Sequence, residues 1–300
     1  MIEATWLSLR AAGLVLSLQA AGAALFGALF LGGLERSAAV VRRSARRAAL
    51  AALLVLLAQA LWEPVELAGE VAGLTDAAVL HLFLLSATAV AMLAGGVGLV
   101  CVAVGLRSRA APPHPLAITG CTLILGSFLL SGHTAAHPQR PLLAALLLIH
   151  VAIVSWWFGS LRPLRQLLVL EAPETAARVL TAFSALAVWW VPVIALAGAA
   201  MAALLLPDFG ALAQPYGVLL LAKVALFALL LGLAALNRLR LVPALVAGAP
   251  TAAARLRRSI ALEYVLICLV LLVTAVMSGA FSPGDTPRSV LEARAASARA

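Results

Sequence analysis

The fold class is decided by residues 141–161, PLLAALLLIHVAIVSWWFGSL, which contain no Asp, Glu, Lys or Arg. At about 1.5 Å of rise per residue, a helix of this length crosses the roughly 30 Å hydrocarbon core of a bilayer. Seven further apolar segments of similar character lie along the chain, at residues 6–32, 48–67, 77–106, 116–133, 179–206, 213–236 and 259–281. We therefore predict an all-α, polytopic membrane helix bundle with eight transmembrane helices.

The composition excludes an ordinary soluble domain. The 300 residues are 64% hydrophobic and 11% charged, with a mean hydropathy of +1.09, whereas soluble proteins carry about 25% charged residues. The net charge of +9 does not indicate a nucleic-acid partner, because the arginines fall into short loops between the apolar runs. The three cysteines lie inside apolar runs without CxxC spacing, which argues against a disulfide framework.

The charges of the expected loops alternate along the chain. Basic residues follow the first, third, fifth and seventh segments: Arg36, Arg42, Arg43, Arg46, Arg47, Arg107, Arg109, Arg162, Arg165, Arg178, Arg238, Arg240, Arg255, Arg257 and Arg258. The opposite loops carry mainly acids: Glu63, Glu66, Glu70, Asp76 and Asp208. Because basic loops stay in the cytoplasm, we predict a bacterial inner-membrane protein with both termini periplasmic. We expect residues 1–283 to form the membrane domain and residues 284–300 to form a poorly ordered polar tail.

Histidines gather at and below the outer surface of this topology. His133 and His137 are four residues apart before Pro138, so a helix that continues through them places both imidazoles on one face. Two solvated loop histidines are the alternative. His150 lies nine residues past Pro141, about 14 Å into the membrane. Polar groups at that depth often mark a pathway or a site, although a histidine hydrogen-bonded to a neighbouring helix is the plainer interpretation.

Further soft donors accompany these histidines. In the expected helix 77–106, His81, Thr88, Met92 and Gly95 follow one stripe, with His81 near the outer surface. Met201 and Met277 lie near the outer ends of their helices. Thioether and imidazole together suit Cu(I), whereas ordinary packing is the alternative for each methionine. The sequence thus indicates a metal path through His81, His133, His137, His150, Met92, Met201 and Met277.

Two oppositely charged residues lie inside the last two apolar segments. Lys223 is central in 213–236, and Glu263 lies about one and a half turns into 259–281. A structural ion pair would lower the burial cost of both groups. A role in gating or proton coupling is the alternative.

Five stretches of the sequence resemble a known family, the CopD copper resistance proteins. They are SGHTAAH, LIHVAIVSWWFGSLRPL, RVLTAFSALAVWWVPVIALAG, PYGVLLLAKVALFALLLGLAALNRLRLVPAL and RRSIALEYVLICLVLLVTAVMSG, within residues 120–283. The His-to-Trp segment and the cluster of Asn237, Arg238 and Pro243 are the most specific. One position differs, because the family has Gly where this chain has Ser160.

The resemblance implies an inner-membrane protein, not an enzyme, that moves copper, as Cu(I) or Cu(II), across the membrane, usually inward. It also implies a separate periplasmic copper chaperone of the CopC kind. The same His-containing helix resembles one in the protoporphyrinogen oxidase HemJ. That likeness supplies the alternative of a redox protein that binds haem b through His81, His133, His137 or His150.

Overall fold

The computed structural model describes residues 2–107, 115–130, 138–206 and 209–280. Within these ranges the chain is helical and contains no β-strand. The α-helices are α1 (Ile2–Phe30), α2 (Ala38–Ala68), α3 (Ala77–Leu84), α4 (Ala87–Gly105), α5 (Pro115–Ser127), α6 (Arg140–Leu170), α7 (Pro173–Leu205), α8 (Pro215–Leu236), α9 (Val242–Val246) and α10 (Ala252–Ala280). Short 3₁₀ segments are η1 (Leu31–Gly33), η2 (Val71–Leu74) and η4 (Phe209–Ala213), and a π-helical segment, η5 (Asn237–Leu241), joins α8 to α9.

Seven of the described helices are long and apolar enough to cross a membrane. They are α1, α2, α4, α6, α7, the continuous rod from α8 to α9, and α10. The expected polytopic all-α class is therefore confirmed. The eighth expected segment corresponds to α5, which has 13 described residues and falls short of a span by itself. The count of eight and the side of the two termini stay predictions.

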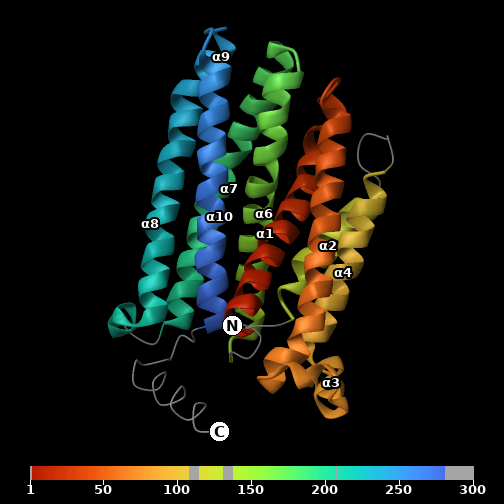
Figure 1. Ribbon diagram of the computed structural model, residues 1–300. Coiled ribbons are helices and arrows are strands. Elements are labelled where there is room, and N and C mark those ends of the chain that lie inside the picture. Colours follow the sequence, from red (N-terminus) through yellow and green to blue (C-terminus); the bar gives the residue numbers. More distant parts are fainter. Residues whose placement is uncertain (1, 108–114, 131–137, 207–208, 281–300) are drawn as a thin grey trace.

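Helix α1 runs through the middle of the bundle and packs on α2, α5, α6 and α10 (Figure 1). On one side α4 packs on α2 and α5, and on the other α7 packs on α6 and α8 on α10. The α1–α6 crossing is a backbone contact, because a Cβ at Gly159 would overlap the backbone of Gly22. Gln19 Nε2 donates to the Gly159 carbonyl at 3.1 Å in the same place. Small residues thus allow α6 to pack closely on the central helix α1.

Ser160, where the family has Gly, is accommodated at this crossing. Its side chain is fully buried, and its hydroxyl donates to the Trp156 carbonyl of its own helix at 2.6 Å. The close approach to α1 needs the preceding residue, Gly159, to lack a side chain. The chain therefore keeps the glycine at which the two backbones meet.

Two expected loops are largely helical instead, and the segment predicted at 48–67 continues through Pro64. The basic run 36–47 belongs largely to α2, which begins at Ala38. Residues 162–170 continue α6 past Pro163, and residues 62–68 continue α2 past Pro64. Each of these two helices has 31 residues, or about 46 Å at the standard rise, so their charged ends extend beyond a 30 Å core. Proline and charge did not end them.

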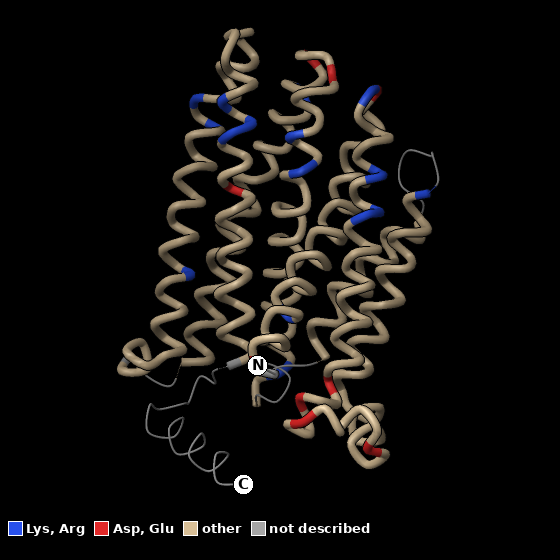
Figure 2. The backbone as a smooth tube through the Cα atoms, viewed as in Figure 1, with Lys and Arg blue, Asp and Glu red and all other residues tan. Residues whose placement is uncertain are grey.

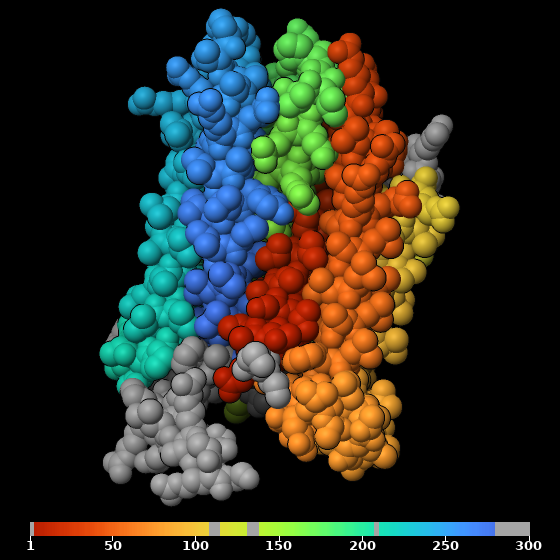
Figure 3. Space-filling view, viewed as in Figure 1, coloured from red at the N-terminus to blue at the C-terminus, as the bar shows by residue number. Residues whose placement is uncertain are grey.

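The expected helix 77–106 is in fact two helices, so that expectation is wrong. Helix α3 ends at Leu84, and α4 begins after Ser86, whose backbone is extended and whose hydroxyl accepts a hydrogen bond from the Ala89 amide at 3.1 Å. This is an N-cap, which starts a new helix. The stripe that joined His81 to Met92 on one face is therefore interrupted. Figure 3 shows η2 and α3, in orange, as a lobe at one end of the bundle.

Figure 2 shows most of the Lys and Arg toward one end of the molecule, together with a few acids, and a cluster of Asp and Glu at the other. We call one the basic end; its described arginines include Arg42, Arg43, Arg46, Arg47, Arg162, Arg165, Arg238, Arg240, Arg255, Arg257 and Arg258. The other, the acidic end, carries Glu63, Glu66, Glu70 and Asp76 at the end of α2 and in the lobe. The alternation expected from the loops thus corresponds to a real polarity of the bundle.

Candidate functional site

His150 lies in the outer third of α6, counted from the acidic end, and faces α7. Its Nδ1 is 3.3 Å from the carbonyl oxygen of Ile194, and its ring lies against Gly198. A carbonyl oxygen only accepts hydrogen bonds, so Nδ1 carries the proton and donates, which leaves a lone pair on Nε2. Metal-ligating histidines commonly donate their second N–H to a backbone carbonyl in this way. The imidazole is oriented as a ligand requires.

Two other predicted residues lie close to this level of the bundle. Met201 follows Gly198 by three residues, so it lies on the same face of α7, one turn nearer the acidic end. Lys223 is the ninth residue of α8 and is half-buried. The ammonium group of Lys223 interacts electrostatically with His150, and the thioether of Met201 lies on the face of α7 that contacts the histidine.

The remaining predicted donors are dispersed or lie outside the described residues. His81 is exposed on α3, which packs on α2, η2 and α4. Met92 is half-buried on α4, on the side where Gly95 contacts Ser127 of α5, so the structure does not place it beside His150. Met277 is buried on α10, two residues before Gly279, which contacts Leu7 and Arg10 of α1. His133 and His137 fall within 131–137, outside the described residues.

No group of three or more His, Cys, Asp or Glu side chains within the described ranges is arranged to hold a metal ion. His150 and His81 are the two described histidines; α3 packs on α2, η2 and α4, whereas α6 packs chiefly on α1, α7 and α10. The described residues therefore offer single donors along a path rather than one formed centre. The histidine pair at 133 and 137 belongs to the part of the chain that the structure does not describe.

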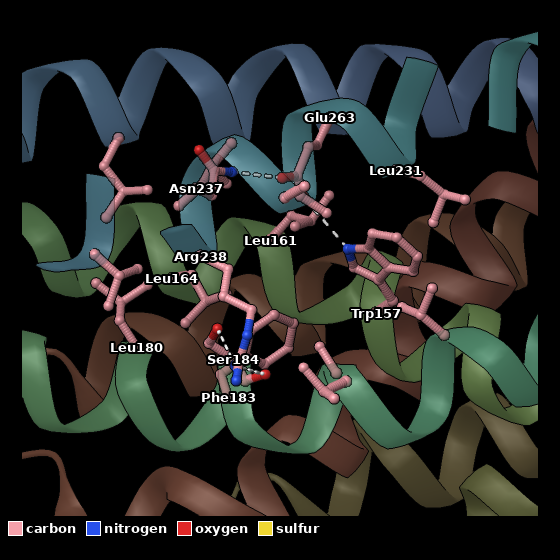
Figure 4. Close-up of a pocket in the computed structure, with 18 of the residues that line it drawn as sticks. Trp157, Leu161, Leu164, Leu180, Phe183, Ser184, Leu231, Asn237, Arg238 and Glu263 are labelled. Carbon is pink, nitrogen blue, oxygen red and sulfur yellow. Dashed lines mark hydrogen bonds between the residues drawn. The ribbon is translucent and has the colours of Figure 1, made fainter. Parts of the chain in front are cut away.

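A second site lies toward the basic end, around Glu263 of α10. The carboxylate is 3% exposed and accepts hydrogen bonds from Trp157 Nε1 at 3.3 Å and from Asn237 Nδ2 at 2.5 Å (Figure 4). Trp157 comes from α6 and Asn237 from the first residue of η5. Three helical elements therefore meet at one buried carboxylate. π-Helical turns such as η5 are frequent at functional sites.

Glu263 does not pair with Lys223. Asn237, which bonds the carboxylate, is fourteen residues beyond Lys223 along α8 and η5, a separation of about 21 Å. The two residues of the expected ion pair thus belong to different levels of the bundle, because their helices run antiparallel and place them at unequal depths. The described residues show no ion pair between them.

A cavity of about 270 Å³ lies next to this carboxylate. Its walls are mostly aliphatic and aromatic side chains of α6, α7, α8 and α10, and its polar lining comes from Ser184, Asn237, Arg238 and Glu263. Arg238 donates through one guanidinium nitrogen to the carbonyl and the hydroxyl of Ser184, at 2.8 and 3.0 Å. Figure 4 shows this guanidinium directed at Ser184, away from Glu263. The cavity joins the buried carboxylate to the exposed Arg238.

Sequence reasoning did not foresee this network, although its members lie in the two most specific parts of the family resemblance. Trp157 belongs to the His-to-Trp segment, and Asn237 and Arg238 to the cluster before Pro243. The sequence did contain an indication of this network, because these are polar residues within otherwise apolar runs. A second omission is Arg10 in α1, which stacks over Trp6 with a 5.5 Å separation and interacts electrostatically with Glu63 and Glu66.

The comparison with family models places a known signature over the C-terminal part of this bundle. Searches of curated proteins and of solved structures gave no match. The matched segment runs from α7 to α10 and includes Lys223, Asn237 and Glu263. Residues 177–277 match the family described as "Copper resistance protein D", CopD, which confirms over this segment the resemblance seen in the sequence.

Proposed function

We propose that this protein is an inner-membrane copper transporter that collects copper at its acidic end and passes it inward. The observation that carries the proposal is the match of α7–α10 to the CopD family. The orientation of His150 supports it, because Nε2 is left free to bind a metal while Nδ1 donates to Ile194. Copper is the cargo in this proposal, and the chain acts as a carrier rather than an enzyme.

In this proposal the acidic end faces the periplasm. Arginine-rich segments are retained in the cytoplasm, which puts the basic end there and both termini outside. His81, His133 and His137 receive copper at the outer surface. His150 is the intramembrane station, and Met92, Met201 and Met277 are auxiliary thioether donors.

The acidic lobe supports a further part of the proposal. Glu63, Glu66, Glu70 and Asp76 lie at the acidic end, where negative charge raises the local concentration of cations. A separate periplasmic chaperone of the CopC kind is the expected partner at this surface. In this proposal Lys223, whose charge acts on His150, regulates occupancy of that station, since a positive charge opposes a bound metal ion.

Copper uptake into proteoliposomes tests the proposal. His150→Ala should lower copper affinity by at least about tenfold, the effect expected even of outer-shell changes at a metal site. The pair His133→Ala and His137→Ala should reduce the copper bound per chain. His114→Ala, a histidine outside the proposed set, is the matched control and should behave as the parent chain.

The absorption spectrum and metal content of the purified protein can contradict the proposed copper transport. A Soret band with one iron per chain would replace transport by haem chemistry. Equal copper uptake by the parent chain and by liposomes without protein would also contradict the proposal.

A further inference from the structure

The carboxylate of Glu263 has no positively charged partner among the described residues, although it is almost completely buried. Its two partners, Trp157 and Asn237, are neutral N–H donors. Removing an ionised carboxylate from water costs several kcal/mol unless a cation or hydrogen bonds offset the loss. Two neutral hydrogen bonds reduce that cost, but leave the charge itself uncompensated. A buried carboxylate in this state is prepared to take up a cation.

The charged and titratable groups around Glu263 do not supply this cation. In η5, Arg238 is held by Ser184. In α6, Arg162 lies over the ring of Tyr264, 5.6 Å from its centroid, rather than on Glu263. In α10 itself the charged or titratable residues within five positions are Arg258, which is exposed, Tyr264 and Cys268. The cavity-lining residues of α7, α8 and α9 carry no charge, and Arg10 of α1 lies against Gly279, about 24 Å along α10 from Glu263.

The donor chemistry of the cavity identifies which cation fits. Copper as Cu(I) needs sulfur or imidazole lone pairs, and none of the residues lining the cavity carries either group. Mg²⁺ and Ca²⁺ need several oxygen ligands around the ion, whereas one carboxylate with two N–H donors does not form such a shell. A proton needs only the carboxylate. The cavity has room for several water molecules between Glu263 and the exposed Arg238.

The side-chain amide of Asn237 can form a hydrogen bond with Glu263 whether that carboxyl group is ionised or protonated. With the carboxylate ionised, its Nδ2 donates to Glu263. Its Oδ1 is buried without a hydrogen-bond partner, and the residue is 8% exposed. Turning the amide by 180° presents Oδ1 to a protonated Glu263, whose O–H then donates to it. The otherwise unexplained Oδ1 thus acquires a partner when the acid form is present.

We propose that Glu263, with Trp157 and Asn237, forms a proton-binding site that exchanges protons through the cavity with the solution at the basic end. The carboxylate takes up one proton and becomes a neutral carboxylic acid, and releases the same proton in the reverse step. The coupling role rests on the proposed copper transport: proton uptake at Glu263 from the basic end is linked to the release of copper at that end. Proton binding itself does not depend on copper.

Infrared difference spectra of the copper-free protein, acid minus alkaline, test proton binding directly. The parent chain should show a carboxylic acid C=O band that Glu263→Gln removes. Glu174→Gln, which removes an exposed glutamate of α7, is the matched control and should keep the band. Trp157→Phe retains Glu263 and should move the midpoint of the band to higher pH, because the ionised form loses one hydrogen bond. An unchanged spectrum for Glu263→Gln would overturn the inference.

Copper uptake into proteoliposomes with and without a pH gradient tests the coupling. The parent chain should transport faster when the copper-receiving side is the more acidic, and Glu263→Gln should lose that dependence. Parent uptake that ignores the gradient would overturn the coupling while the infrared band still reports the proton site. Absence of any copper uptake by the parent chain would instead overturn the proposed function, so the two failures are distinguishable.

Discussion

At the scale of single residues, two buried carboxylates connect separate helices of the described chain through hydrogen bonds. Glu263 gathers α6, η5 and α10 at one carboxylate. Glu171, directly after α6, does the same at the basic end. One of its carboxylate oxygens accepts from the backbone amides of Arg36 and Ser37, at 3.0 and 2.7 Å, and from the Ser37 hydroxyl at 2.6 Å. It thereby ties the end of α6 to the start of α2.

The Glu171 contact predicts a pH-dependent stability. Burial opposes ionisation, but the hydrogen bonds from Ser37 and Arg36 outweigh it and hold the pKa of Glu171 below its usual value. The stabilisation of the folded state by ionised Glu171 is therefore fully present above the ordinary pKa of a glutamate. It is lost as the pH falls through the lowered pKa of Glu171. Glu171→Ala should cost about 2 kcal/mol at pH 7, as expected for hydrogen bonds to a charged group, and less at pH 4.

Thermal unfolding in detergent between pH 4 and 7 measures this difference. Glu174→Ala removes an exposed carboxylate three residues away and should leave the unfolding temperature within error of the parent value. A destabilisation by Glu171→Ala that is as large at pH 4 as at pH 7 would show that the charge of Glu171 is not responsible.

At the scale of helices, close backbone approach decides which elements touch. The α1–α6 crossing at Gly22 and Gly159 and the α4–α5 crossing at Gly98 and Gly120 leave no room for a side chain. Inside a bilayer the hydrophobic effect does not drive helices to associate, so close packing of this kind has to stabilise their contacts. Other glycines make no such contact: a Cβ at Gly232, in the last third of α8, meets no atom within 4 Å.

These two classes of glycine predict opposite results. Gly159→Ala should destabilise the protein by about 1–3 kcal/mol, because the added methyl group overlaps the backbone of α1. Gly232→Ala should be neutral or should stabilise by up to about 1 kcal/mol, since alanine restricts the unfolded chain. Unfolding of both variants in the same detergent provides the comparison, and equal stability of the two would refute the packing argument.

At the scale of the whole molecule, charge polarity predicts orientation. Glu70 is exposed at the acidic end and Arg257 at the basic end. Glu70→Cys should react with a membrane-impermeant maleimide added to cells with a permeabilised outer membrane. Arg257→Cys should react only after the inner membrane is opened. The parent chain, whose three cysteines lie in α4, α5 and α10, is the control, and the reverse labelling pattern would mean that the protein is oriented the other way.

The sequence by itself determined the membrane class, the helical architecture, the charge polarity and the CopD resemblance. These follow from composition, from the length of apolar runs and from the order of residues, all of which are local quantities. For the same reason His150 could be recognised as a polar group deep in an apolar run. The helix ends were less well predicted, because proline and arginine are tolerated where a long helix leaves the hydrocarbon core, as at Pro64 and Pro163.

Only the tertiary structure decided which polar residues meet. The sequence offers Lys223 and Glu263 as an ion pair although it already sets them at depths about a turn or more apart. In the structure Glu263 instead bonds Trp157, 106 residues away, and Asn237. The interruption between α3 and α4, which separates His81 from Met92, likewise depends on one N-cap, the Ser86 hydroxyl that accepts a hydrogen bond from the Ala89 amide. Partner choice depends on helix direction, tilt and crossing point, which are properties of packing between distant segments and leave no periodic signal in the chain.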